Sequence, residues 1–152
     1  MVWLATRNRL VTMDRVASWS QGVDTSCVLC KNAPETRNHL FFECSVSSQI
    51  WKQLTQGILQ SSFVNTWDAL SSLIIGSSMG KQKRFCLRFA FQTTIYTLWR
   101  ERNNRRHGEA PAPPEVLLKL IDKAVRNKLS LMQSKRVKSF DGVLPYWFST
   151  RL

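Results

Sequence analysis

Three cysteines and one histidine stand close together in the first third of the chain, at the spacing C-x₂-C-x₈-H-x₄-C. They are Cys27, Cys30, His39 and Cys44, and they include three of the four cysteines in the sequence. Tetrahedral Zn²⁺ needs four such donors, and the two-residue gap lets one tight turn of backbone present the first pair. Because four protein ligands leave no position for water, the pattern predicts one structural zinc ion rather than a catalytic one. The alternative is a group of ordinary buried cysteines with a histidine nearby.

The net charge of +12 is distributed unevenly along the 152 residues. Residues 1–80 hold six Lys and Arg against five Asp and Glu, whereas residues 81–138 hold fifteen against four. A basic half of this kind favours a polyanionic partner, with nucleic acid first and an anionic membrane surface second. The alternative is a solvated basic face that has no specific partner.

The cellular setting can be inferred from the apolar pattern and the cysteines. No run of about 18 apolar residues occurs, and the N-terminal residues lack the pattern of a secretory signal. Thiols that bind metal must stay reduced, which agrees with an intracellular compartment. We therefore expect an intracellular, nuclear protein that is not attached to a membrane.

Apolar residues recur at three- and four-residue steps along almost the whole chain, and no run alternates as a strand would. The fold class predicted is therefore mostly α, a small helical domain with an N-terminal zinc knuckle. A long helix over about 82–104 is expected to be the central one, because apolar side chains occupy almost its whole circumference. A basic amphipathic helix is expected from Pro113 or Pro114 to about Met132, followed by an irregular tail in which residues 146–148 fold back onto the body.

Polar residues in front of apolar segments predict where other helices begin. Thr12, Thr36, Ser45 and Thr66 each have a side-chain oxygen that can accept a hydrogen bond from a free N–H of the first helical turn. The helix next to Thr36 is predicted to be short, to carry His39 and to deliver the last cysteine.

The side chains needed for catalysis are few. The sequence has two histidines, and the one outside the predicted zinc site is His107. It stands in a basic loop, where a solvated side chain is expected. The ten carboxylates are scattered, with no adjacent pair to hold Mg²⁺, and no glycine-rich phosphate loop is present. A zinc deaminase signature does not fit either, because here the cysteine pair precedes the histidine. The chain is therefore not expected to be an enzyme.

Two groups of basic side chains are candidates for contacts with RNA or DNA. They stand at the end of the long helix and on the final helix, and they are Arg100, Arg102, Arg105, Arg106, Lys119, Lys123 and Arg126. The helix macrodipole also favours arginines at a C-terminal end without any ligand, and a lysine face is common on a solvated amphipathic helix. Any binding is therefore expected to have low sequence specificity.

Several segments of the sequence resemble the zinc-binding domain that follows the reverse transcriptase in plant LINE-type, non-LTR retrotransposons. They are Trp3-Leu-Ala-Thr-Arg-Asn-Arg-Leu10, Cys27-Val-Leu-Cys30, His39-Leu-Phe-Phe-Glu-Cys44 and Ile50-Trp51. Residues 90–108 and 124–129 resemble the C-terminal region of the same polyproteins. The resemblance implies that the four knuckle residues are zinc ligands and that the domain helps a polymerase to hold template RNA or target DNA. The sequence lacks the polymerase and the endonuclease, so it is not expected to copy RNA.

The resemblance also suggests how the chain is organised. Residues 1–60 are expected to form the zinc-binding domain, with an upstream part missing; residues 61–109 a helical region with the long helix; and residues 110–152 a Pro-rich connector, a basic helix and an aromatic tail. Two other functions stay open. One is a zinc-stabilised protein-interaction module in which Trp3 and Trp19 anchor a partner protein at the truncated edge. The other is a retroelement remnant with no function.

Overall fold

The computed structural model describes residues 1–76 and 78–151. The α-helices in these ranges are α1 (Val2–Thr6), α2 (Met13–Ala17), α3 (Ser45–Leu59), α4 (Trp67–Ile75), α5 (Lys81–Arg106), α6 (Pro114–Ser134) and α7 (Val143–Ser149). Three short turns accompany them: a π-helical turn η1 (His39–Glu43) and two 3₁₀ turns, η2 (Gln60–Ser62) and η3 (Lys138–Phe140). The described ranges form no strand, only an isolated β-bridge between Ser26 and Pro34. The predicted mostly-α fold is confirmed.

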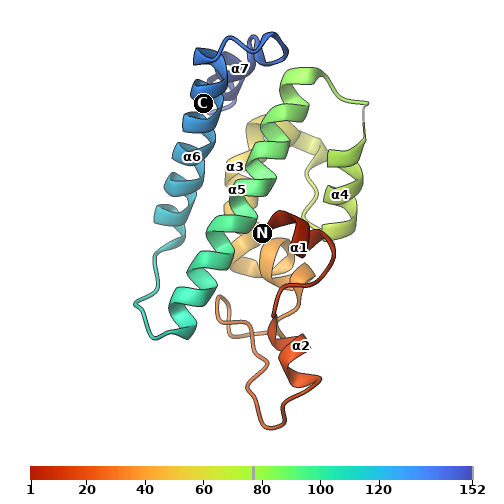
Figure 1. The fold of residues 1–152 in the computed structure, drawn as a ribbon, viewed down its shortest axis with the longest axis vertical. Helices are drawn as coiled ribbons and strands as arrows, with labels where there is room; N and C mark the ends of the chain where they lie inside the picture. Colours follow the sequence, from red (N-terminus) through yellow and green to blue (C-terminus); the bar gives the residue numbers. More distant parts are fainter. Residues whose placement is uncertain (77, 152) are drawn as a thin grey trace.

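The long helix α5 is the axis of the molecule. It contacts α1, α3, α4, α6 and α7, and Figure 1 shows it running through the centre of the ribbon. Its buried residues, which include Leu87, Ala90, Ile95 and Leu98, share one side, whereas Tyr96 is 54% exposed. The helix is thus central as predicted, but it is buried along one broad face and not around its circumference. No helix among the described residues is long and apolar enough to cross a membrane.

An aromatic cluster joins the knuckle to the helices. Phe42 of η1 stacks on Phe91 of α5, with ring centroids 5.3 Å apart, and meets the edge of Trp51 of α3 at 5.1 Å. Trp67 of α4 packs against Phe42 at 5.9 Å. Aromatic side chains bury large areas, and offset or tilted pairs add to the energy of that burial. Because η1 leads directly to Cys44, this packing fixes the position of the last zinc ligand relative to α5.

Two of the predicted N-cap hydroxyls accept the expected hydrogen bond, and two do not. The Thr66 hydroxyl accepts a hydrogen bond from the N–H of Ala69 at 3.3 Å, and the Thr36 hydroxyl accepts one from the N–H of His39 at 3.1 Å. Thr12 occupies the N-cap position of α2, but its hydroxyl donates to the Asp14 carboxylate instead of capping the helix. Ser45 is the first helical residue of α3, since the preceding cysteine occupies the N-cap position.

The tail is not irregular, because α7 occupies Val143–Ser149. Gly142 precedes this helix with φ +76°, a left-handed conformation that glycine adopts at no steric cost. Val143 and Trp147, one turn apart, are fully buried, and the Trp147 indole N–H donates to the Asp122 carboxylate of α6 at 3.0 Å. The expected return of the aromatic segment to the body holds for Trp147, whereas Phe148 is exposed.

A close approach of backbones explains a glycine inside α3. A Cβ atom built on Gly57 would lie 2.2 Å from the carbonyl oxygen of Thr150, at the end of α7. Glycine in a helix interior costs about 1 kcal/mol relative to alanine, so it is kept where a side chain does not fit. The two helices meet at this point because Gly57 has no side chain.

Candidate metal centre and basic surface

Residues 25–35 fold back on themselves as a tight hairpin that carries the first two cysteines. The Cys27 N–H donates to the Ala33 carbonyl at 2.7 Å, and the Lys31 N–H donates to the Cys27 carbonyl at 2.8 Å. Lys31, directly after Cys30, has φ +62°, and this left-handed residue turns the chain back. The hairpin therefore presents both sulfurs from one turn, as the two-residue gap predicts.

The second pair of ligands stands at the two ends of η1. His39 is its first residue, and the N–H of Cys44 donates to the His39 carbonyl at 2.7 Å. A π-helical turn is wider than an α-helical one and occurs often at functional sites. Cys44 lies at the N-cap of α3, where the positive end of the helix dipole favours a thiolate. Both side chains are thus held by elements that the aromatic cluster fixes.

The four side chains converge on one point. Their ligand atoms all lie within 4.8 Å of one another, the Cys27 and Cys44 sulfurs are 3.9 Å apart, and the Cys30 sulfur is 3.3 Å from Nε2 of His39. Zinc bonds of about 2.0 to 2.3 Å in a tetrahedron place the ligand atoms about 3.6 to 3.8 Å apart. The donor set and its spacing therefore fit one Zn²⁺ ion.

Hydrogen bonding distinguishes the two buried thiols. The Cys27 thiol donates to the Cys44 sulfur, and this bond raises the pKa of Cys27 and lowers the pKa of Cys44. Burial adds to the increase at Cys27. Thiolates are the form that binds zinc, so metal binding releases the protons that these thiols hold.

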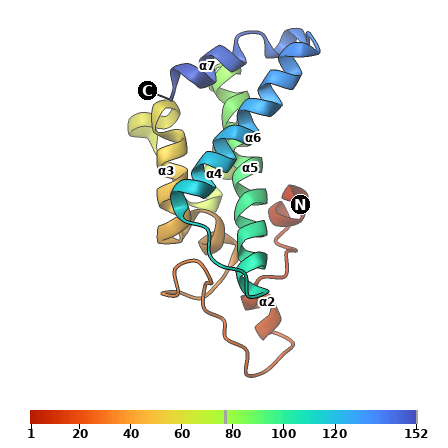
Figure 2. The ribbon, with the colours of Figure 1, turned by 90° about the vertical axis from the view of Figure 1, so that its left-hand side faces the viewer.

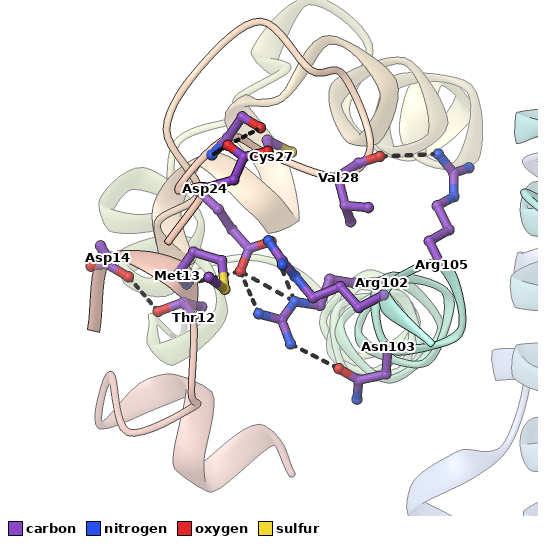
Figure 3. A network of polar contacts seen from close by, with 12 residues as sticks. Thr12, Met13, Asp14, Asp24, Cys27, Val28, Arg102, Asn103 and Arg105 are labelled. Atoms are coloured by element: carbon purple, nitrogen blue, oxygen red, sulfur yellow. Dashed lines mark hydrogen bonds and ion pairs between the residues drawn. The ribbon is translucent and has the colours of Figure 1, made fainter. Parts of the chain in front are cut away.

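A buried carboxylate connects the knuckle to α5. Glu35 is the last residue of the hairpin and is fully buried, and its Oε1 lies 2.7 Å from Nη2 of Arg102. The same oxygen accepts the backbone N–H of Met13 at 3.0 Å, and Arg106 reaches Oε2 at 3.6 Å. Figure 3 shows the Arg102 guanidinium turned into this network, and Nη2 also donates to the Val11 carbonyl at 3.1 Å. The pair thus joins three segments: the chain before α2, the knuckle and the end of α5.

A second pair on α5 connects the knuckle with the segment that follows the helix. Glu101 accepts from Nε of Arg105 at 2.7 Å and from the backbone N–H of Ala112 at 2.8 Å. Arg105 donates in turn to the carbonyls of Val28 at 3.5 Å and Ala112 at 3.2 Å, and Figure 3 shows its side chain reaching Val28. The Pro-rich connector is therefore held against α5 next to the hairpin.

These contacts show which of the predicted nucleic-acid-binding side chains are free, while the binding itself stays a prediction. Arg102 is only 6% exposed, so it cannot serve as a surface contact for phosphate. Arg105 and Arg106 are likewise used in ion pairs at the end of α5, and Arg126 pairs with Asp122 at 3.0 Å on α6. Of the seven candidates, the exposed ones that make no ion pair within the described residues are Arg100, Lys119 and Lys123.

Sequence reasoning placed Glu35 among scattered carboxylates and missed its role. The sequence offered only an acidic residue shortly after the cysteine pair in a chain rich in arginine. That signal does not identify a partner 67 positions away. Trp3 and Trp19, the predicted partner anchors, are 57% and 61% exposed.

Comparison with known families matched residues 1–51 to the family described as zinc-binding in reverse transcriptase. No curated protein and no solved structure matched the chain. The matched range holds all four clustered side chains, and the basic half lies outside it. The family match and the convergent donor set agree that the chain carries one structural zinc site. Its first third is therefore similar to the zinc-binding domain of reverse transcriptases.

Proposed function

We propose that the protein is a non-catalytic zinc-binding module that binds RNA or DNA, with low sequence specificity, through the basic surface of its C-terminal half. The zinc site supports a structural role, since four protein side chains complete a tetrahedral shell. Among the described residues, these four side chains are the one group of three or more potential ligands that could hold a metal ion. The resemblance of the sequence to plant LINE-type elements supports an origin in a retrotransposon polyprotein.

Unpaired positive charge carries the proposal. Residues 81–138 hold fifteen Lys and Arg, and eleven of them make no ion pair with any described residue. The macrodipole does not explain the cations at the N-terminal end of α5, where Lys81 and Lys83 oppose it and the first turn has no acidic residue. A high density of solvated cations attracts the phosphate backbone and releases its counterions.

Salt dependence tests the proposal. The logarithm of the association constant for a short single-stranded RNA or DNA should fall linearly with the logarithm of salt concentration. The triple variant Arg100→Ala/Lys119→Ala/Lys123→Ala should reduce this slope by about 2, since each lost contact to a single strand removes about 0.7. Fluorescence anisotropy titrations at several salt concentrations measure both quantities.

The control is a pair of exposed cations in the N-terminal half. Arg9→Ala/Lys52→Ala removes charge from residues 1–80 and should leave the slope close to that of the wild type. No binding at low salt, or the same slope for the triple variant as for the wild type, would contradict the proposed surface.

Exposure of two tryptophans favours a second candidate, a protein-interaction surface. Trp3 and Trp19 present more than half of their area to solvent, and tryptophan is enriched among residues that dominate binding energy. The wild-type protein should then retain a partner from nuclease-treated cell extract that the variant Trp3→Ser/Trp19→Ser does not retain. Identical retention by the two proteins, compared by mass spectrometry, would count against this candidate.

A further inference from the structure

A pocket of about 450 Å³ lies between α5 and α6. The two helices run antiparallel and side by side, joined by the connector of residues 107–113, as Figures 1 and 2 show. Pockets of this size are typical of small-ligand sites. The pocket is separate from the zinc site, and the zinc-binding match does not extend to it.

The walls of the pocket combine flat apolar surface with polar groups. Tyr96 of α5 and Leu120 of α6 line it and are 54% and 51% exposed, so an aromatic ring is available at its opening. Asn104, which is partly buried, also lines it and brings a side-chain amide to the pocket. An amide offers a donor and an acceptor side by side, as the edge of a nucleobase does.

Positive charge lies in the α5 wall of the pocket and is available nearby on α6. Arg100 forms part of the α5 wall, whereas Lys123 is outside the lining and directly precedes the lining residue Ala124 on α6. Both cations are exposed and make no ion pair within the described part of the chain. A purely apolar ligand would gain nothing from these cations, whereas a base joined to phosphates on either side would be attracted by them.

Hydrogen bonds of Glu101 and Arg105 hold the connector at the end of the pocket nearest to the zinc hairpin. Glu101 and Ala112 line the pocket, and the Ala112 N–H donates to Glu101 at 2.8 Å. Arg105 contacts both residues and reaches the carbonyl of Val28 in the zinc hairpin. The connector that closes this end is therefore linked to the zinc-binding hairpin through Arg105.

We propose that this pocket binds one unpaired base of a single-stranded RNA or DNA. The base stacks on Tyr96, its edge pairs with the Asn104 amide, and the adjoining phosphates contact Arg100 and Lys123. Aromatic stacking of unpaired bases is the usual way in which proteins distinguish single strands from duplexes. The inference rests on the proposed function and adds to it a preference for single strands and a defined site.

The test compares oligonucleotides that share phosphates but differ in bases. Fluorescein-labelled oligouridylate, oligothymidylate, an abasic strand of equal length and a duplex are titrated with the full chain at one low salt concentration. The wild type should bind the two intact single strands more tightly than the abasic strand and the duplex. Tyr96→Ala should weaken binding to the intact strands by roughly 5- to 100-fold, as loss of one stacked base does, and leave abasic binding unchanged.

Two variants separate stacking from folding. Tyr96→Phe keeps the ring and should bind as the wild type does, and Phe148→Ala, which removes an exposed ring on α7, should have no effect. Equal affinity of the wild type for intact and abasic strands, with Tyr96→Ala unchanged, would overturn the pocket while leaving phosphate binding intact. Absence of binding to every strand would overturn the proposed function as well.

Discussion

Cys44→Ser is expected to abolish zinc binding and to unfold the first third of the chain. Structural zinc contributes an apparent 10 to 16 kcal/mol or so, which is comparable with the whole stability of a small domain. The variant replaces one of two buried thiol ligands by a hydroxyl that binds zinc poorly, and it does so between η1 and α3. Elemental analysis should fall from about one zinc per chain to near zero. Circular dichroism should show a lower melting temperature, with much of α5 and α6 retained.

The fourth cysteine provides the control for that variant. Cys86 is fully buried on α5 and lies outside the metal cluster, and burial raises the pKa of its thiol to about 12. Cys86→Ser should therefore leave the zinc content unchanged. Excess chelator added to the wild type should lower its melting temperature as Cys44→Ser does. Full zinc content in Cys44→Ser, or an unchanged melting curve in chelator, would show that the four side chains are only a buried cluster.

Glu35→Ala is expected to lower the free energy of unfolding by about 3–5 kcal/mol, because it leaves a buried arginine without its partner. Arg102 cannot turn to solvent without breaking its contacts with Val11 and Asn103. The double variant Glu35→Leu/Arg102→Leu removes both charges and should be less destabilised than the matching single variants Glu35→Leu and Arg102→Leu. Urea unfolding of the four proteins gives the coupling energy between the two residues.

An exposed ion pair on α6 shows whether burial of the Glu35–Arg102 pair causes the expected loss of stability. Arg126 lies 3.0 Å from Asp122, and its side chain is 42% exposed. Arg126→Ala should cost no more than about 1 kcal/mol, as exposed ion pairs do. If Glu35→Ala cost as little as Arg126→Ala, the buried network would have no special role in stability.

The zinc site and most helices were predictable because their signals are local. The ligand spacing lies within 18 residues, and the helices repeat their apolar pattern within a few turns. The roles of the arginines were not predictable from the same information. Arg102 stands in a run that is typical of a solvated basic helix end, and only the tertiary fold brings Glu35 against it. A separation of 67 positions leaves no local pattern to read.

The tail shows a different limit of sequence reasoning. Residues 135–151 contain a glycine, a proline and charged residues, which together are typical of an irregular segment. The structure forms α7 because Gly142 turns the chain and Trp147 finds a buried position with a hydrogen-bond partner on α6. Tertiary packing, and not local propensity, decides the conformation there.

The buried Glu35–Arg102 pair also bears on how far a zinc-binding module extends. The family match ends at residue 51, yet the carboxylate inside that range is neutralised by a guanidinium far beyond it. Phe42, also inside the matched range, stacks on Phe91 outside it. The packing of the matched range therefore extends past the sequence boundary of the family. A change at position 35 is therefore expected to cost least when position 102 changes with it, so the two sites are coupled across the boundary of the match.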